Sequence, residues 1–453
     1  MHVKKQKENV LFLCLIAVLI SSIGFVSPQA AKALSIVFSA FLIAWANPLG
    51  LPALAILWIQ AIDFCIGTNG VEVELPGAIF VAGFPLTLSL ATLFFITTRV
   101  LWEWLVRPKT FGRSRWLTLS FMLWLAFFLI TLASGFMGKS LGHTNWTQPL
   151  RASMALATLF FGIIVAGKLK DKFWVVDWLL RIVVFVLLLM LLGLYWNHVG
   201  FLYIAIGACS LWLMIRQKRW LLAALCGLSS IHFTNSTLTI IAIIALGLLS
   251  GFFLFSAKKC LHRSMFSAFT ALILPFSLFL IVVVLFLPVV FPFNNVGTDT
   301  DLKNRIVFKL YKDRGPLWRA AWDTAIIDLS TVSPSGSSLS VDHPMTRSSG
   351  NLWNIHVHNS FLEMLRQTGF PGAVVFFIVF LRFWLKLRSA LLQPLPPVVL
   401  AFGGAALITS AVGATTGLFP FDFHAGPWIW LWAGIAIGLS QSRHKSISTI
   451  PTG

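Results

Sequence analysis

The residues best suited to chemistry lie together at the end of one polar segment. His356, His358, Asn359 and Ser360 follow one another closely, and Glu363 comes three residues after Ser360. Ser360 and Glu363 match the pattern of a capping box, which predicts a helix that starts immediately after His358. The positive end of this helix would attract an anion and disfavour imidazolium. We therefore expect a neutral His358 beside an anionic substrate, in the role of a general base.

The neighbours of His358 allow more than one interpretation. His356 would point to the opposite side of an extended chain, so its contact with substrate is left open. Asn359 adjoins the same helix start and is a candidate for substrate binding. Glu363 has the alternative role of a helix cap alone. Gly369 and Pro371 would end the helix after two turns.

A second set of candidates is basic and precedes these residues in the same segment: Arg305, Lys309, Lys312, Arg314 and Arg319. A short amphipathic helix is predicted over residues 316–329, because Pro316 suits the first helical position and apolar residues recur with helical spacing. Arg314 would lie just ahead of its start. Arginine suits bidentate recognition of phosphate, so we expect Arg314, Arg305 and Arg319 to contact an anionic substrate. The two lysines would rather face lipid headgroups.

Other chemistries have little support. Asp299 and Asp301 form the sole DxD pattern of the polar segment, which is a weak indication of a metal site. The five cysteines are scattered through apolar stretches without a pairing or zinc-binding pattern. We expect neither a metal nor a cofactor.

The composition places most of the chain in a membrane. Hydrophobic residues make up 58% of the 453 positions and charged residues 11%, and the mean hydropathy is +0.86. Backbone groups in lipid are satisfied only in helices or closed barrels, and apolar runs such as residues 238–255 are long enough for helices. The net charge of +19 collects in clusters between these runs, as in cytoplasmic loops, so nucleic acid is not expected as a partner.

The expected architecture is an all-α polytopic membrane protein with about 12 to 14 transmembrane helices and both termini in the cytoplasm. Residues 1–290 would form the N-terminal transmembrane helices, residues 291–360 one large periplasmic loop, and residues 361–453 the C-terminal helices and a cytoplasmic tail. The predicted spans are 10–26, 33–47, 50–66, 80–104, 116–134, 151–166, 173–195, 199–215, 220–235, 237–256, 265–290, 371–387, 395–413 and 427–441.

The motifs resemble those of a known family. Arg314 with Leu317 and Trp318, followed by His358-Asn359, nine residues and Gly369-x-x-Gly372, resembles the region shared by O-antigen ligases and O-antigen polymerases. The resemblance covers roughly residues 230 to 440. It implies a metal-independent, GT-C-like glycosyltransferase that acts at the periplasmic face of the bacterial inner membrane on a glycan carried by undecaprenyl diphosphate.

The resemblance also implies roles for single residues. His358 would match the essential histidine of the family, and Arg314 an arginine that contacts the diphosphate. One departure concerns residues 234–237, which read Thr-Asn-Ser-Thr where many relatives carry a basic residue. Arg305 or Arg151 would then replace that contact.

The acceptor decides between two activities. Lipid A core as acceptor would make the chain an O-antigen ligase of lipopolysaccharide biosynthesis, which we favour, whereas a second lipid-linked repeat unit would make it an O-antigen or exopolysaccharide polymerase. Either transfer should invert the anomeric configuration. A transporter of an anionic lipid or solute is the more distant alternative. It predicts charged residues at the middle of the bilayer, but the sequence offers only Asp177 and Arg181, which would pair near the cytoplasmic end of a helix and have no symmetric partner.

Overall fold

The computed structural model describes the helices at the two ends of the chain and part of the region between them. The described residues are 2–23, 26–66, 79–81, 84–86, 88–108, 114–140, 148–169, 172–191, 314–327, 359–393, 395–416 and 426–448, with short pieces between 271 and 311. The predicted spans 199–215, 220–235 and 237–256, as well as the DxD pattern, lie outside them.

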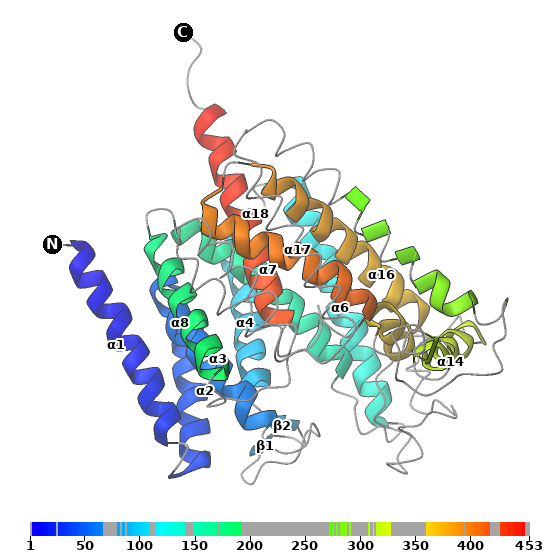
Figure 1. Cartoon of the computed structure of the whole chain (residues 1–453), viewed down its shortest axis with the longest axis horizontal. Helices are drawn as coiled ribbons and strands as arrows, with labels where there is room; N and C mark the ends of the chain where they lie inside the picture. Colours follow the sequence, from blue (N-terminus) through cyan, green and yellow to red (C-terminus); the bar gives the residue numbers. More distant parts are fainter. Residues whose placement is uncertain are drawn as a thin grey trace.

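The N-terminal part is a series of helices that follows the predicted spans closely (Figure 1). These elements are α1 (His2–Ile23), α2 (Pro28–Trp45), the short 3-10 helix η1 (Pro48–Gly50), α3 (Leu51–Ile66), α4 (Leu88–Val106), α6 (Arg115–Ser140), α7 (Gln148–Leu169) and α8 (Trp174–Leu191). The C-terminal part contains α14 (Arg314–Ile327), α16 (Ser360–Leu391), α17 (Pro397–Thr416) and α18 (Gly426–Ser448).

Five helices in the described part of the chain are long and apolar enough to cross a membrane: Lys4–Ile23, Leu88–Val106, Arg115–Met137, Pro149–Leu169 and Ser360–Leu391. They confirm a helical polytopic membrane protein. The number of 12 to 14 spans and the large periplasmic loop stay predictions.

A small hairpin is the one departure from helix and loop among the described residues. Strands β1 (Ile79–Val81) and β2 (Phe84–Leu86) pair antiparallel, with Ile79 opposite Leu86. The predicted span 80–104 is therefore wrong at its start, because the membrane helix begins at Leu88. A short apolar run fits a strand as well as a helix, and periodicity alone does not separate them.

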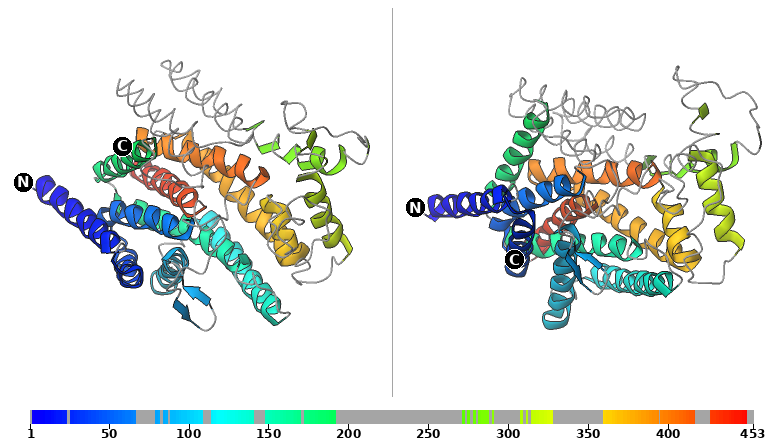
Figure 2. Two further views of the ribbon diagram at one scale, coloured as in Figure 1. Left: turned by 60° about the horizontal axis from the view of Figure 1, so that its bottom comes forward. Right: turned by 90° about the horizontal axis from the view of Figure 1, so that it is seen from below.

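The centre of the bundle is a contact between the backbones of α7 and α18. A Cβ on Gly434 would lie 2.0 Å from the carbonyl oxygen of Leu159, and one on Gly438 would lie 2.7 Å from the Cβ of Ala166. A Cβ on either Gly162 or Gly434 would lie 3.0 Å from the Cα of the other. Small residues allow membrane helices to pack this closely. Since the facing residues advance together along both helices, α7 and α18 run parallel (Figure 2).

Helices α6 and α16 pack beside this pair and run antiparallel to each other. Ser134 of α6 contacts the backbone at Gln367 of α16, whereas Ser120 of α6 contacts Arg382. Helix α6 is likewise antiparallel to α7, since Thr131 bonds to Ser153 at 2.8 Å, while Phe121, earlier in α6, contacts Phe160, later in α7. We call the end that holds the C-terminus of α6 and the N-termini of α7 and α16 the outer end, and the opposite end the inner end. The predicted topology places the outer end in the periplasm.

Candidate active site at the outer end

Helix α16 starts where the sequence predicts, directly after His358, but with a different cap. Asn359 is the N-cap, and its Oδ1 accepts hydrogen bonds from the backbone N–H groups of Phe361 and Leu362 at 3.0 and 3.1 Å. Ser360 is the first helical residue. The predicted capping box is therefore wrong by one position, because asparagine and serine cap equally well. Asn359 is fully buried.

The first turns of α16 form a separate segment. Gly369 has φ 67° and ψ −176°, which interrupts the helix between Ser360 and Leu391, and Pro371 follows inside it. A positive φ of this kind suits glycine, and proline removes a backbone donor. The predicted two-turn helix and the predicted span 371–387 are thus two parts of one kinked element.

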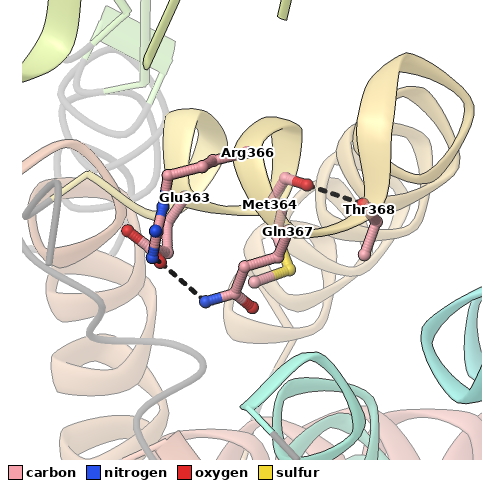
Figure 3. Close-up of polar contacts among 5 residues, drawn as sticks. All are labelled: Glu363, Met364, Arg366, Gln367 and Thr368. Atoms are coloured by element: carbon pink, nitrogen blue, oxygen red, sulfur yellow. Dashed lines mark hydrogen bonds and ion pairs between the residues drawn. The ribbon is translucent and has the colours of Figure 1, made fainter. Parts of the chain in front are cut away.

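A buried polar cluster lies on the first part of α16. Glu363 is fully buried, forms an ion pair with Arg366 and accepts a hydrogen bond from Nε2 of Gln367 at 2.6 Å (Figure 3). Ser134 of α6 donates to the backbone oxygen of Gln367. The carboxylate of Glu363 therefore has partners on its own helix beyond the capping role that the sequence left open. Charges at this depth of an apolar bundle usually mark function.

The sequence interpretation did not single out Arg366 and Gln367. Their signal was present, because Glu363, Arg366 and Gln367 have the spacing that brings helical side chains together and they interrupt an otherwise apolar segment. A glutamate that only caps a helix needs no side-chain partner one turn later, so the capping role predicted for Glu363 does not point to Arg366 and Gln367.

Helix α14 covers the same part of α16. Leu317, Trp318 and Ala321 are buried and pack with Leu362 and Leu365. The predicted amphipathic helix is thereby confirmed, and its apolar face packs against protein. Its start was wrong by two residues: α14 begins at Arg314. Proline fits the third position as well, since no N–H in the first turn has a partner within the helix.

The contact between α14 and α16 brings together part of the predicted site. Arg314 is the first residue of α14, Arg319 lies half-buried in its second turn, and Asn359 caps α16. His358 adjoins Asn359 in the chain. His358, His356 and Arg305 themselves lie outside the described residues.

Arg151 is a further cation at the outer end. It lies in the first turn of α7, where its residue is 7% exposed. Ser153, two residues on, accepts the hydrogen bond from Trp124 of α6 through its carbonyl oxygen at 2.9 Å and the bond from Thr131 through its hydroxyl. A buried arginine at this level has the reach and charge for an anionic group at the membrane surface.

The described residues give the outer end a surplus of positive charge. Toward this end, α7, α14 and α16 carry four arginines, namely Arg151, Arg314, Arg319 and Arg366, against the carboxylates Glu363 and Asp323. Such a surplus attracts an anionic ligand. No group of three or more His, Cys, Asp or Glu side chains within the described ranges could hold a metal ion, and the expected metal independence stays a prediction.

The comparison with protein families connects this site to known proteins. Residues 221–377 match the family described as O-antigen ligase, and the matched range includes α14 and the first part of α16. The comparisons with curated proteins and with solved structures found no match. The family match confirms the resemblance that the motifs carry: residues 221–377 of the chain are similar to the O-antigen ligase family.

Proposed function

We propose that the chain transfers a glycan from undecaprenyl diphosphate to an acceptor hydroxyl, and that it is an O-antigen ligase with lipid A core as acceptor. The observation that supports this proposal is the packing of α14, which begins at Arg314, on the first turns of α16, which Asn359 caps. Both helix starts favour an anion.

The donor suits this place in the bundle. A polyprenyl diphosphate keeps its chain in lipid and its charged head at the membrane surface, so its enzyme needs cations at the end of a lipid-facing bundle. Arg314 and Arg319 on α14 meet this need, and Arg151 on α7 supplies a third arginine at the same end. We assign the contact left open by residues 234–237 to Arg151 or Arg305.

The proposed reaction is a single displacement. The oxygen of the acceptor hydroxyl attacks the anomeric carbon, and His358 accepts the hydroxyl proton. The bond between that carbon and the diphosphate oxygen breaks, and undecaprenyl diphosphate leaves with its added negative charge stabilised by Arg314, Arg305 and Arg319. Attack from the face opposite the leaving group inverts the configuration.

Asn359 receives a changed role in this proposal. Its Oδ1 is occupied by two backbone N–H groups, and the residue is fully buried. We therefore assign it to positioning: the cap fixes where α16 begins and thereby where the adjacent His358 lies. His356 stays a candidate for contact with the sugar.

The choice of acceptor is tested with the purified full-length protein in liposomes that contain undecaprenyl-diphosphate-linked glycan. One arm adds lipid A core and the other only further lipid-linked glycan. A ligase forms product in the first arm alone, whereas chain elongation in the second arm would make it a polymerase. No transfer in either arm would remove the proposed function.

The proposed location is the bacterial inner membrane with the outer end facing the periplasm. In a cysteine-free background, Ser338→Cys should react with an impermeant thiol reagent added to cells with a permeabilised outer membrane, and Gly112→Cys should not. Equal reaction at both positions would contradict this orientation.

The transporter alternative gains no support from the charged pair on α8. Asp177 and Arg181 lie 3.5 Å apart, and their side chains are 49% and 64% exposed. Among the described residues, a pair this exposed does not resemble the buried charges that line a substrate pathway.

A further inference from the structure

The inner end of the bundle carries a second group of charges, remote from the proposed active site. Glu103 of α4 is buried and binds Arg99 at 2.7 Å one turn before it and Arg107 at 3.8 Å one turn after it. Lys168 of α7 donates to the carbonyl oxygen of Trp45, the last residue of α2, at 3.3 Å. The C-terminal ends of three helices therefore meet at this group.

The group has more positive than negative charge among the described residues. Arg99, Glu103, Arg107 and Lys172 all act electrostatically on Lys168, so four cations and one carboxylate lie in this part of the bundle. The carboxylate is closest to Arg99, whose side chain is 13% exposed. Arg107 is 67% exposed and lies at the outer limit of an ion pair. Arg107 and Lys172 thus have charge left for an external anion.

The surroundings of this group face lipid. Trp102, Leu105 and Val106 of α4 are 60%, 67% and 52% exposed, and Trp45 of α2 is 51% exposed. Large apolar side chains with this exposure on membrane helices contact acyl chains, and tryptophan is typical of the interface. The enrichment of Lys and Arg that sets membrane topology concerns water-facing loops. Arg99, in contrast, is nearly buried within a helix beside this apolar surface.

We propose that the inner ends of α2, α4 and α7 bind the phosphate headgroup of an acidic glycerophospholipid. Arg107 and Lys172 contact the phosphate, Arg99 and Glu103 hold Arg107 in place, and the acyl chains lie along Trp102 and its apolar neighbours. A membrane surface with acidic lipids attracts such basic groups. The occupant is a lipid because the apolar surface continues directly from the charges.

The test measures binding of phosphatidylglycerol to the full-length protein by native mass spectrometry in a neutral detergent. Phosphatidylcholine and inorganic phosphate are the comparison ligands. The variant Arg107→Gln/Lys172→Gln should bind phosphatidylglycerol roughly 25-fold more weakly, since each basic residue near an acidic surface contributes about a factor of five. Both residues lie at the edge of the fold, so the melting temperature without added lipid should not change.

The matched control is Arg181→Gln. Arg181 is 64% exposed and pairs with Asp177 four residues away on α8, which matches the exposure of Arg107 and the spacing of its ion pair with Glu103. Its variant should bind phosphatidylglycerol as the wild type does. Unchanged affinity in the double variant, or an equal loss in the control, would overturn the proposal. Displacement of phosphatidylglycerol by an equal concentration of inorganic phosphate would also overturn it, because the occupant would then be a free anion.

Discussion

The contact between α7 and α18 and the contact between α14 and α16 lie in different surroundings. Gly162, Gly434 and Gly438 bring the first pair into backbone contact without a charged group at these positions. At the second contact, Glu363 and Arg366 lie buried beside apolar packing. Burying a charge pair gives little net stability, whereas close packing gives much. The difference agrees with the proposal that the outer end carries the chemistry, while the centre contributes stability.

The largest expected effect comes from removing one partner of the buried pair. Glu363→Leu leaves the Arg366 guanidinium in apolar surroundings without this carboxylate, which should lower the free energy of unfolding by about 3 to 5 kcal/mol. Thermal unfolding in detergent measures the loss. An unchanged melting temperature would mean that the pair is not buried in the folded protein.

The double variant Glu363→Leu/Arg366→Leu separates stability from chemistry. Replacing a whole buried pair by apolar residues is often neutral for stability, so most of the lost stability should return. Glycan transfer should stay low, because the cluster lies in the helix whose start directly follows the proposed base. Full transfer in the stable double variant would show that the cluster has no part in the reaction.

A smaller effect is expected at the centre. Gly434→Ala places a Cβ 2.0 Å from the carbonyl oxygen of Leu159, so α7 and α18 must separate. Overpacking of this kind costs about 1 to 3 kcal/mol. Gly167→Ala is the matched control on α7, since nothing lies within 4 Å of its added Cβ. Equal melting temperatures for the two variants would contradict the backbone contact.

The smallest of these effects concerns the cap of α16. Asn359→Ala removes the acceptor for two backbone N–H groups and should cost about 1 kcal/mol. Asn359→Ser keeps a capping oxygen and should retain most of this stability. Transfer should follow the same order, because the cap positions His358. If the serine variant were as destabilised as the alanine variant, the loss would come from packing and not from the cap.

The sequence predicted the helices well where apolar runs are long. Helices α3, α6 and α7 begin and end close to the predicted spans, because an apolar run of membrane length has few alternatives. The start of α16 was also predictable, since His358 is followed by two residues that both cap helices. The choice between Asn359 and Ser360 depends on backbone geometry that composition does not contain.

Other features were not predictable for physical reasons. The hairpin at residues 79–86 comes from an apolar run that fits strand or helix equally. The partners of Glu363 became visible only when the helix register was known, because a glutamate three residues after a serine also fits a capping box. The close contact of Gly162 with Gly434 joins residues far apart in the sequence, so no local pattern announces it.

The central claim is that His358 acts as the base at an outer-end site for a lipid diphosphate, and transfer from purified undecaprenyl-diphosphate-linked glycan tests it most directly. His358→Ala should lower the rate about 10²- to 10⁴-fold while the protein inserts and melts as the wild type does. His356→Ala, two residues away, is the control and should lose less. Activity should persist in EDTA. Wild-type transfer by the His358→Ala protein would contradict the claim, and loss on chelation that a divalent metal restores would replace the base with a metal site.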